Sequence, residues 1–138
     1  MNEHQIYVVK RNGRGKVPLD IEKIHEMVEH ACEDITGVSA SEVEMNSGLQ
    51  FHDGISTQEI QQILIKSAAD LISLEKPNYQ YVAARLLLFS LRKQLNRKLW
   101  DHPHIHDQVQ KGIKLGVYDK DLDKWYDKRD WDRMEQWI

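Results

Sequence analysis

A short glycine-containing turn close to the amino terminus most constrains how this chain can fold. Asn12 and Gly13 both tolerate positive φ and lie between two β-prone runs within residues 7–19, a pattern typical of a tight hairpin. Asp20 follows at the position of a helix N-cap, and apolar side chains then recur every three or four residues up to Ile35. The sequence therefore predicts a β-hairpin that leads directly into a helix over residues 21–35.

Three cations lie on this predicted hairpin and helix. Lys10 and Arg11 end the first β-prone run, and Lys23 falls in the first turn of the helix. A cation in a first turn opposes the helix dipole, and this placement makes sense if an anion is also bound there. The three side chains can converge on one phosphate chain, or they can belong to a solvated basic hairpin.

The rest of the first hundred residues is predicted to be helical. Ser39 with Glu42 and Ser56 with Glu59 match the capping-box pattern, so we expect helices from about residue 40 to 49 and from residue 57 onward. Pro77 forces a break. The buried stripe of the third helix comprises Ile60, Ile63, Leu64, Ser67, Ala68, Leu71 and Ile72.

A fourth helix, over residues 79–95, carries apolar side chains on more than one face, which is typical of a helix at the centre of a bundle. Phe89 and Lys93 are four positions apart and share a face. They can form one wall of a nucleotide pocket, or they can be a core ring and a lysine whose stem lies along it. A fifth helix is expected to end near Gly116, with another short segment at residues 119–122.

The tail carries Trp125, Trp131 and Trp137 among many charges. Tryptophans rarely stay exposed in such a setting. We expect them either to fold back on the bundle or to dock on a surface that this chain does not contain.

Composition excludes several functions. The net charge of −3 and the pI near 6.1 argue against a general nucleic-acid binder, and no apolar run is long enough to cross a membrane. The single cysteine, Cys32, excludes an internal disulfide and a cysteine zinc ribbon and fits the reducing cytoplasm. His102, His104 and His106 alternate around Pro103 without a second ligand cluster, so no metal site is expected.

The chain resembles a known family at several motifs. Val9–Gly13, Val17–Asp20 and Lys23-Ile24 resemble the opening of the ATP-cone domain, and Thr57–Ile60 with Ile65–Ala69 resembles its third helix. The run Pro77–Leu86 is similar to the stretch after the cone in the large subunit of class I ribonucleotide reductase. Gly116–Asp119 with Leu122 resembles the connector of that subunit, so the resemblance covers essentially the whole chain.

The resemblance implies a mainly α fold, in which a small hairpin covers a four-helix bundle over residues 1–97. Residues 98–138 would form a helical connector toward a catalytic barrel that is absent from this chain. It also implies an allosteric activity site, where ATP with Mg²⁺ activates the reductase and dATP inhibits it. The phosphates would meet Lys10, Arg11, Lys23 and Lys93, and the adenine would meet Val8, Val17, Asp20 and Ile24. Thr57, Ile60 and Gln61 would lie near the sugar and phosphates, with Phe89 at the pocket edge.

The chain departs from the enterobacterial type of this subunit, which has histidine where this chain has Gln61 and Ser90. The loop between Gly13 and Asp20 is also one residue longer, and Lys16 or Val17 replaces an acidic residue sometimes found there. A glutamine side chain can bond either ribose hydroxyl. Because it is flexible, we expect the ATP and dATP affinities to lie within roughly a factor of ten of each other.

The implied partners are the catalytic remainder of the large subunit and the small subunit that generates the radical, with a homo-oligomer as a further possibility. Ribonucleotide reduction needs several cysteines, so a chain with only Cys32 holds no catalytic residues and is expected to be inactive alone. A transcriptional repressor with a cone would need a cysteine-rich zinc ribbon, which is missing. A helical module that only docks on partner subunits is the remaining alternative.

Overall fold

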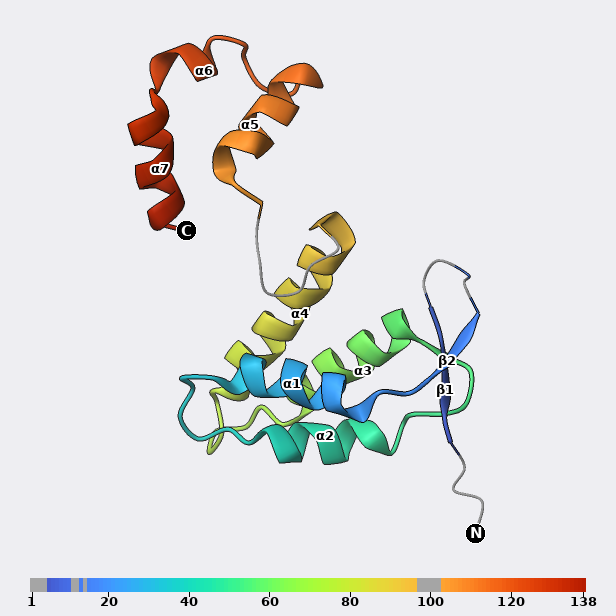
Figure 1. The fold of residues 1–138 in the computed structure, drawn as a ribbon. Coiled ribbons are helices and arrows are strands. Elements are labelled where there is room, and N and C mark those ends of the chain that lie inside the picture. Colours follow the sequence, from blue (N-terminus) through green and yellow to red (C-terminus); the bar gives the residue numbers. More distant parts are fainter. Residues whose placement is uncertain (1–4, 11–12, 14, 97–102) are drawn as a thin grey trace. The chain divides into compact units, whose positions relative to one another are not determined.

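The structure, a computed structural model, describes residues 5–10, 13, 15–96 and 103–138. The contacts divide the chain into two compact units, Met1–Leu91 and Arg92–Ile138 (Figure 1). The division falls within helix α4 (Tyr79–Asn96). The predicted domain boundary after Arg97 lies outside the described residues, and each unit is treated separately below.

A small sheet of three strands opens the amino-terminal unit. Strand β1 (Tyr7–Val9) pairs antiparallel with β2 (Lys16–Pro18) and parallel with β3 (Ile55–Ser56), in the order β2-β1-β3. The β1–β2 hairpin confirms the sequence prediction, whereas β3 was not predicted. The Tyr7 N–H donates to Asp53 Oδ1 at 2.9 Å, and the Gly54 N–H donates to the Tyr7 carbonyl at 2.9 Å, so the turn before β3 is tied to β1.

Four helices complete this unit, as the sequence predicted. They are α1 (Ile21–Cys32), α2 (Ala40–Gly48), α3 (Thr57–Asp70) and α4. Each contributes side chains to the core, among them Val28, Val43, Leu64 and Val82, none of which is exposed. The mainly α architecture with an amino-terminal hairpin is therefore confirmed.

The expected end of the first helix was wrong. Helix α1 ends at Cys32 rather than at Ile35. Glu33 leaves the helical conformation with ψ 133°, and Asp34 then adopts a left-handed conformation with φ 58°. The Arg85 guanidinium from α4 donates to the Ala31 carbonyl at 3.4 Å and also to the Glu33 carbonyl. A side chain from a distant helix thus satisfies carbonyls that the helix end leaves unpaired.

The capping box expected at Ser39 also does not form. Ser39 is the N-cap residue of α2, but its side chain makes no capping hydrogen bond. Glu42, the other half of the expected box, instead pairs with Lys76 at 2.7 Å. A tertiary partner therefore replaces the local one.

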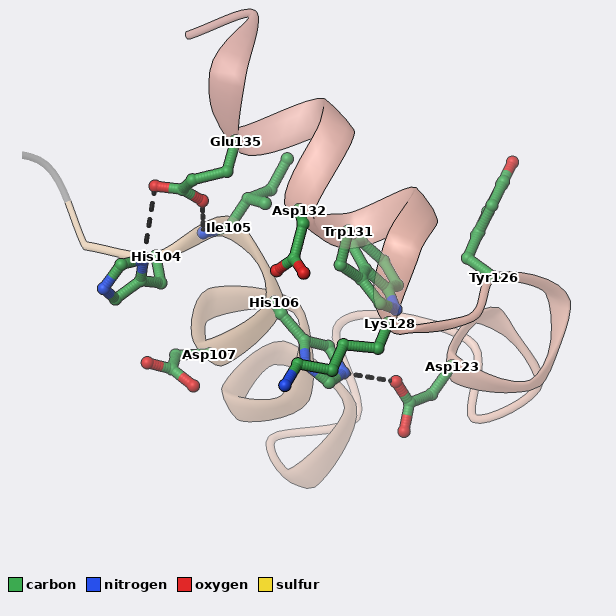
Figure 2. Close-up of a pocket in the computed structure, with 10 residues that line it drawn as sticks. All are labelled: His104, Ile105, His106, Asp107, Asp123, Tyr126, Lys128, Trp131, Asp132 and Glu135. Atoms are coloured by element: carbon green, nitrogen blue, oxygen red, sulfur yellow. Dashed lines mark hydrogen bonds and ion pairs between the residues drawn. The ribbon is translucent and has the colours of Figure 1, made fainter.

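The carboxy-terminal unit contains α5 (Ile105–Lys114), α6 (Leu122–Trp125) and α7 (Lys128–Gln136). The fifth helix was predicted, whereas α7 was not. Trp131 is only 5% exposed and stacks on His106 with ring centroids 4.9 Å apart (Figure 2). Trp125 and Trp137 stay exposed, whereas Trp131 packs within its own unit. Whether these tryptophans reach the bundle or a partner stays a prediction. No helix in the described ranges has the length and apolar character needed to cross a membrane.

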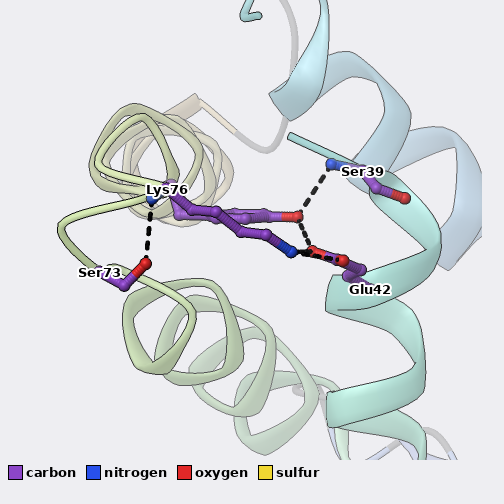
Figure 3. A network of polar contacts seen from close by, with 5 residues as sticks. Ser39, Glu42, Ser73 and Lys76 are labelled. Atoms are coloured by element: carbon purple, nitrogen blue, oxygen red, sulfur yellow. Dashed lines mark hydrogen bonds and ion pairs between the residues drawn. The ribbon is translucent and has the colours of Figure 1, made fainter. Parts of the chain in front are cut away.

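A polar network fastens the start of α4 to the start of α2 (Figure 3). The Tyr79 hydroxyl accepts a hydrogen bond from the Ser39 N–H at 3.0 Å and donates one to the Glu42 carboxylate. The same carboxylate accepts a hydrogen bond from the Lys76 ammonium. The Lys76 ammonium holds the pKa of Glu42 below its ordinary value, and burial raises the pKa of Tyr79. Because Tyr79 is fully buried, its hydroxyl depends on these partners.

Replacing Tyr79 by phenylalanine is expected to destabilise the protein by about 1–2 kcal/mol, because the Ser39 N–H loses its acceptor. The free energy of unfolding in urea measures the change. Tyr81→Phe is the matched control, since Tyr81 lies on the same helix and is 55% exposed. Equal effects of the two substitutions would contradict this role of the network.

Asp34→Gly is expected to stabilise the protein by about 0.5–1 kcal/mol, because glycine adopts positive φ without the steric penalty of a Cβ. The same denaturation experiment tests the change, and Asp34→Ala should destabilise. A loss of stability in the glycine variant would show that the aspartate side chain itself holds this turn.

Candidate functional site

The sheet brings two helix starts to the same place. Strand β2 ends at Pro18, just before α1 begins, and β3 runs directly into α3 (Figure 1). Val8 on the middle strand is paired with Val17 on one side and with Ile55 on the other. The hairpin and the amino-terminal ends of α1 and α3 therefore lie together. Two helix amino termini at one sheet give a positive field from their backbone dipoles.

Asp20 and Lys23 form a local ion pair at the start of α1. The Asp20 carboxylate accepts the Lys23 N–H at 3.3 Å, as an N-cap does, and lies 3.2 Å from the Lys23 ammonium. These contacts hold the pKa of Asp20 below its ordinary value. The Lys23 side chain is 80% exposed and that of Asp20 46% exposed, so both groups remain accessible to a ligand. The N-cap prediction for Asp20 is confirmed.

The start of α3 is capped as its sequence predicted. Ser56 Oγ accepts the Glu59 N–H at 3.1 Å, and the Glu59 carboxylate accepts the Ser56 N–H at 2.8 Å. These hydrogen bonds lower the pKa of Glu59. Because Ser56 also belongs to β3, the capping box fixes the direction in which α3 leaves the sheet.

A buried polar pair joins α3 to α4 further along. The Ser90 hydroxyl donates to Gln61 Oε1 at 2.9 Å, and the two residues are 8% and 6% exposed. Ile60 and Phe89, their neighbours in the sequence, are buried as well. The sequence placed Gln61 at the edge of the apolar stripe, but it did not predict that Ser90 would bind it.

Comparison with known proteins identifies the family to which the chain belongs. Residues 6–94 match the model of the ATP cone domain. The chain belongs to the ATP cone family. This family comprises regulatory domains that bind nucleotides.

The chain is also similar to larger proteins over most of its length. It is 41% identical over 133 residues, or 96% of the chain, to ribonucleoside-diphosphate reductase subunit alpha of Haemophilus influenzae. It is 41% identical over all 138 residues to ribonucleoside-diphosphate reductase 1 subunit alpha of Salmonella typhimurium. A third relative, subunit alpha of the reductase of Helicobacter pylori, is 52% identical over 86 residues, or 62% of the chain and 11% of that relative. The chain spans 17–18% of the length of the first two relatives.

The cone brings together many of the residues that the sequence singled out. The strand pairing and the helix starts gather Val8, Val17, Asp20, Lys23, Ile24 and Thr57, and the pair between α3 and α4 gathers Ile60, Gln61 and Phe89. Lys10 is exposed and its carbonyl accepts the Gly13 N–H at 3.0 Å, within the hairpin turn. Arg11 lies outside the described residues. Lys93 is counted with the carboxy-terminal unit, so its position relative to the hairpin stays a prediction.

A hollow lies in the carboxy-terminal unit. It measures about 500 Å³, and Figure 2 shows His106 between Asp123 and Trp131 at its centre. His106 Nε2 lies 2.7 Å from Asp123 Oδ1, and His104 lies 3.4 Å from Glu135. Within residues 5–10, 13, 15–96 and 103–138, no group of three or more His, Cys, Asp or Glu side chains is arranged to hold a metal ion. His102 lies outside these ranges.

Another hollow, of about 430 Å³, adjoins Cys32 among acidic side chains of α1 and its C-cap. Burial raises the pKa of the Cys32 thiol, which keeps it protonated at neutral pH. Cys32 is therefore suited to a packing role rather than to nucleophilic chemistry.

The charge of Asp20 is expected to stabilise the cone at neutral pH. Its pKa is lowered in the folded state, so this contribution is present above the ordinary value of 3.8 and is lost as the pH falls through the lowered pKa. Asp20→Asn keeps a capping oxygen but removes the charge. The gap in unfolding free energy between the parent and this variant should therefore close at low pH.

Denaturant titrations at several pH values check this variant. If the difference in unfolding free energy between the parent and Asp20→Asn does not change with pH, the effect comes from the shape of the side chain rather than from its charge.

Proposed function

We propose that this chain is the activity-regulating portion of a ribonucleotide reductase large subunit, and that it binds ATP as activator and dATP as inhibitor. One observation carries the proposal: the sheet joins the hairpin to the amino-terminal ends of α1 and α3, in a chain that matches the ATP cone model. The similarity to reductase alpha subunits along the whole chain supports the wider role.

The phosphate chain would lie where the helix dipoles and the cations act together. Lys10 and Lys23 are exposed on the hairpin and on the first turn of α1, and Arg11 and Lys93 are proposed to complete the set. Mg²⁺ in nucleotide sites is commonly bound through the substrate phosphates, so it is expected to accompany the triphosphate.

The ion pair between Asp20 and Lys23 suggests how the site changes when the nucleotide enters. An exposed pair of this kind contributes little to stability, because water screens both charges. Lys23 can therefore turn from Asp20 to a phosphate at small cost. The freed carboxylate oxygen would then accept a hydrogen bond from the amino group of adenine.

The base and the sugar would meet different elements. Val8, Val17 and Ile24 offer apolar contacts for the adenine, and Thr57, Ile60 and Gln61 line the approach along α3. Phe89 would close the edge from α4. Val8 and Ile24 are 4% and 9% exposed, so only their edges can reach a ligand.

The partners follow from the relatives, whose name denotes one subunit of a reductase. We propose that the catalytic remainder of the large subunit and a radical-generating small subunit act with this chain. Because Cys32 is its single cysteine, the chain alone should not turn over ribonucleotides. A helical docking module without nucleotide binding is the competing function, and a binding measurement separates the two.

Calorimetric titration of the 138-residue chain with Mg-ATP and Mg-dATP tests the proposal, and the two nucleotides should compete for one site. Lys23→Ala and Lys93→Ala should each weaken binding by about 1.5–3 kcal/mol, or about 10- to 150-fold, because each removes a charge-assisted contact to phosphate.

Lys66→Ala is the matched control, since Lys66 is an exposed lysine on α3 outside the proposed contacts. It should bind like the parent. Absence of binding by the parent would favour the docking module, and unchanged affinity in both Lys23→Ala and Lys93→Ala would place the phosphates elsewhere.

A further inference from the structure

We infer that the Ser90 hydroxyl sets the preference of the cone between ATP and dATP, by fixing the orientation of the Gln61 side-chain amide. This inference rests on the proposed function and adds a residue to it. Ser90 acts here as a positioning residue, because it works through Gln61.

The hydrogen bond between the two side chains carries the inference. Ser90 Oγ donates to Gln61 Oε1 at 2.9 Å, and both residues are more than nine-tenths buried. A hydrogen bond in such surroundings is costly to break, because the buried oxygen would be left without a donor. The Gln61 oxygen is therefore committed to Ser90.

The orientation of the oxygen decides the orientation of the nitrogen. A glutamine amide presents an acceptor on one side and two donors on the other. With Oε1 held by Ser90, Nε2 points away from Ser90, and among the described residues it makes no hydrogen bond of its own. Gln61 thus offers a fixed N–H donor instead of the flexible, two-sided group that its sequence suggested.

A fixed donor distinguishes the two nucleotides by one hydroxyl. ATP has a 2′-hydroxyl whose oxygen can accept from Gln61 Nε2, whereas dATP presents a C–H bond at the same position and leaves the donor unpaired. A mobile amide would lose less binding free energy with dATP, because it could turn to the 3′-hydroxyl that both nucleotides carry. Removing the Ser90 hydroxyl should therefore weaken the binding of ATP relative to that of dATP, which lowers the ratio of the dATP to the ATP dissociation constant.

The experiment measures the ratio of the dATP to the ATP dissociation constant for the 138-residue chain and its variants by calorimetry. Ser90→Ala should lower this ratio by about two- to tenfold, the range for one neutral hydrogen bond. Ser90→Thr keeps a hydroxyl and should retain the parental ratio. Should Ser90→Ala fail to fold, Ser90→Cys, which is a weak donor of similar size, is expected to lower the ratio in the same direction.

Ser67→Ala is the matched control. Ser67 is a fully buried serine on α3, and its hydroxyl has no hydrogen-bond partner among the described residues. Its removal should leave the ratio unchanged. A Gln61→Ala background adds a second test, because Ser90→Ala should have no further effect once the amide is gone.

The outcomes distinguish a failure of the proposed function from a failure of the inference about Ser90. If the parent binds neither nucleotide, the proposed function fails and the inference falls with it. If the parent binds both and Ser90→Ala keeps the parental ratio, the inference alone is overturned. An equal effect of Ser90→Ala with and without Gln61 would also overturn it, because Ser90 would then act directly.

Discussion

The pairing of one buried residue, Val8, on both sides of its strand ties the hairpin to the start of α3, where the proposed site lies. Val8 lies opposite Val17 in the hairpin and opposite Ile55 in the strand before α3. Without the second pairing, the hairpin would be attached only through the helix that follows it. Isolated hairpins are at best marginally stable, so the start of α3 is as necessary to the proposed site as the hairpin itself.

Local chemistry made much of the fold predictable. The turn at Gly13, the N-cap at Asp20 and the capping box of Ser56 with Glu59 depend on residues within a few positions of one another, and the structure contains each of them. The failures have a common cause in distant partners. Arg85 meets the carbonyl groups at the end of α1 from more than fifty positions away. Lys76 and Tyr79 together bind Glu42, which the local pattern had assigned to Ser39.

The candidate site likewise contains residues that the sequence could place and contacts that it could not. Residues at the start of a helix, such as Asp20 and Thr57, could be placed from the sequence, because capping patterns mark where the helix begins. The contact between Gln61 and Ser90 could not, since the two residues lie 29 positions apart on different helices. Helical spacing identified the face of each helix, but only the packing of α3 against α4 decides which polar side chains on those faces meet.

The parallel pairing of β1 with β3 also has a consequence for the order of folding. Tyr7 and Asp53 bond across 46 positions of the chain, so the sheet closes only after a long loop has been ordered. The ladder that results is just two residue pairs long. We therefore expect the helices to assemble first and this edge to form last and open most readily, so that the Tyr7 amide exchanges its hydrogen with solvent through openings that leave the helical core intact.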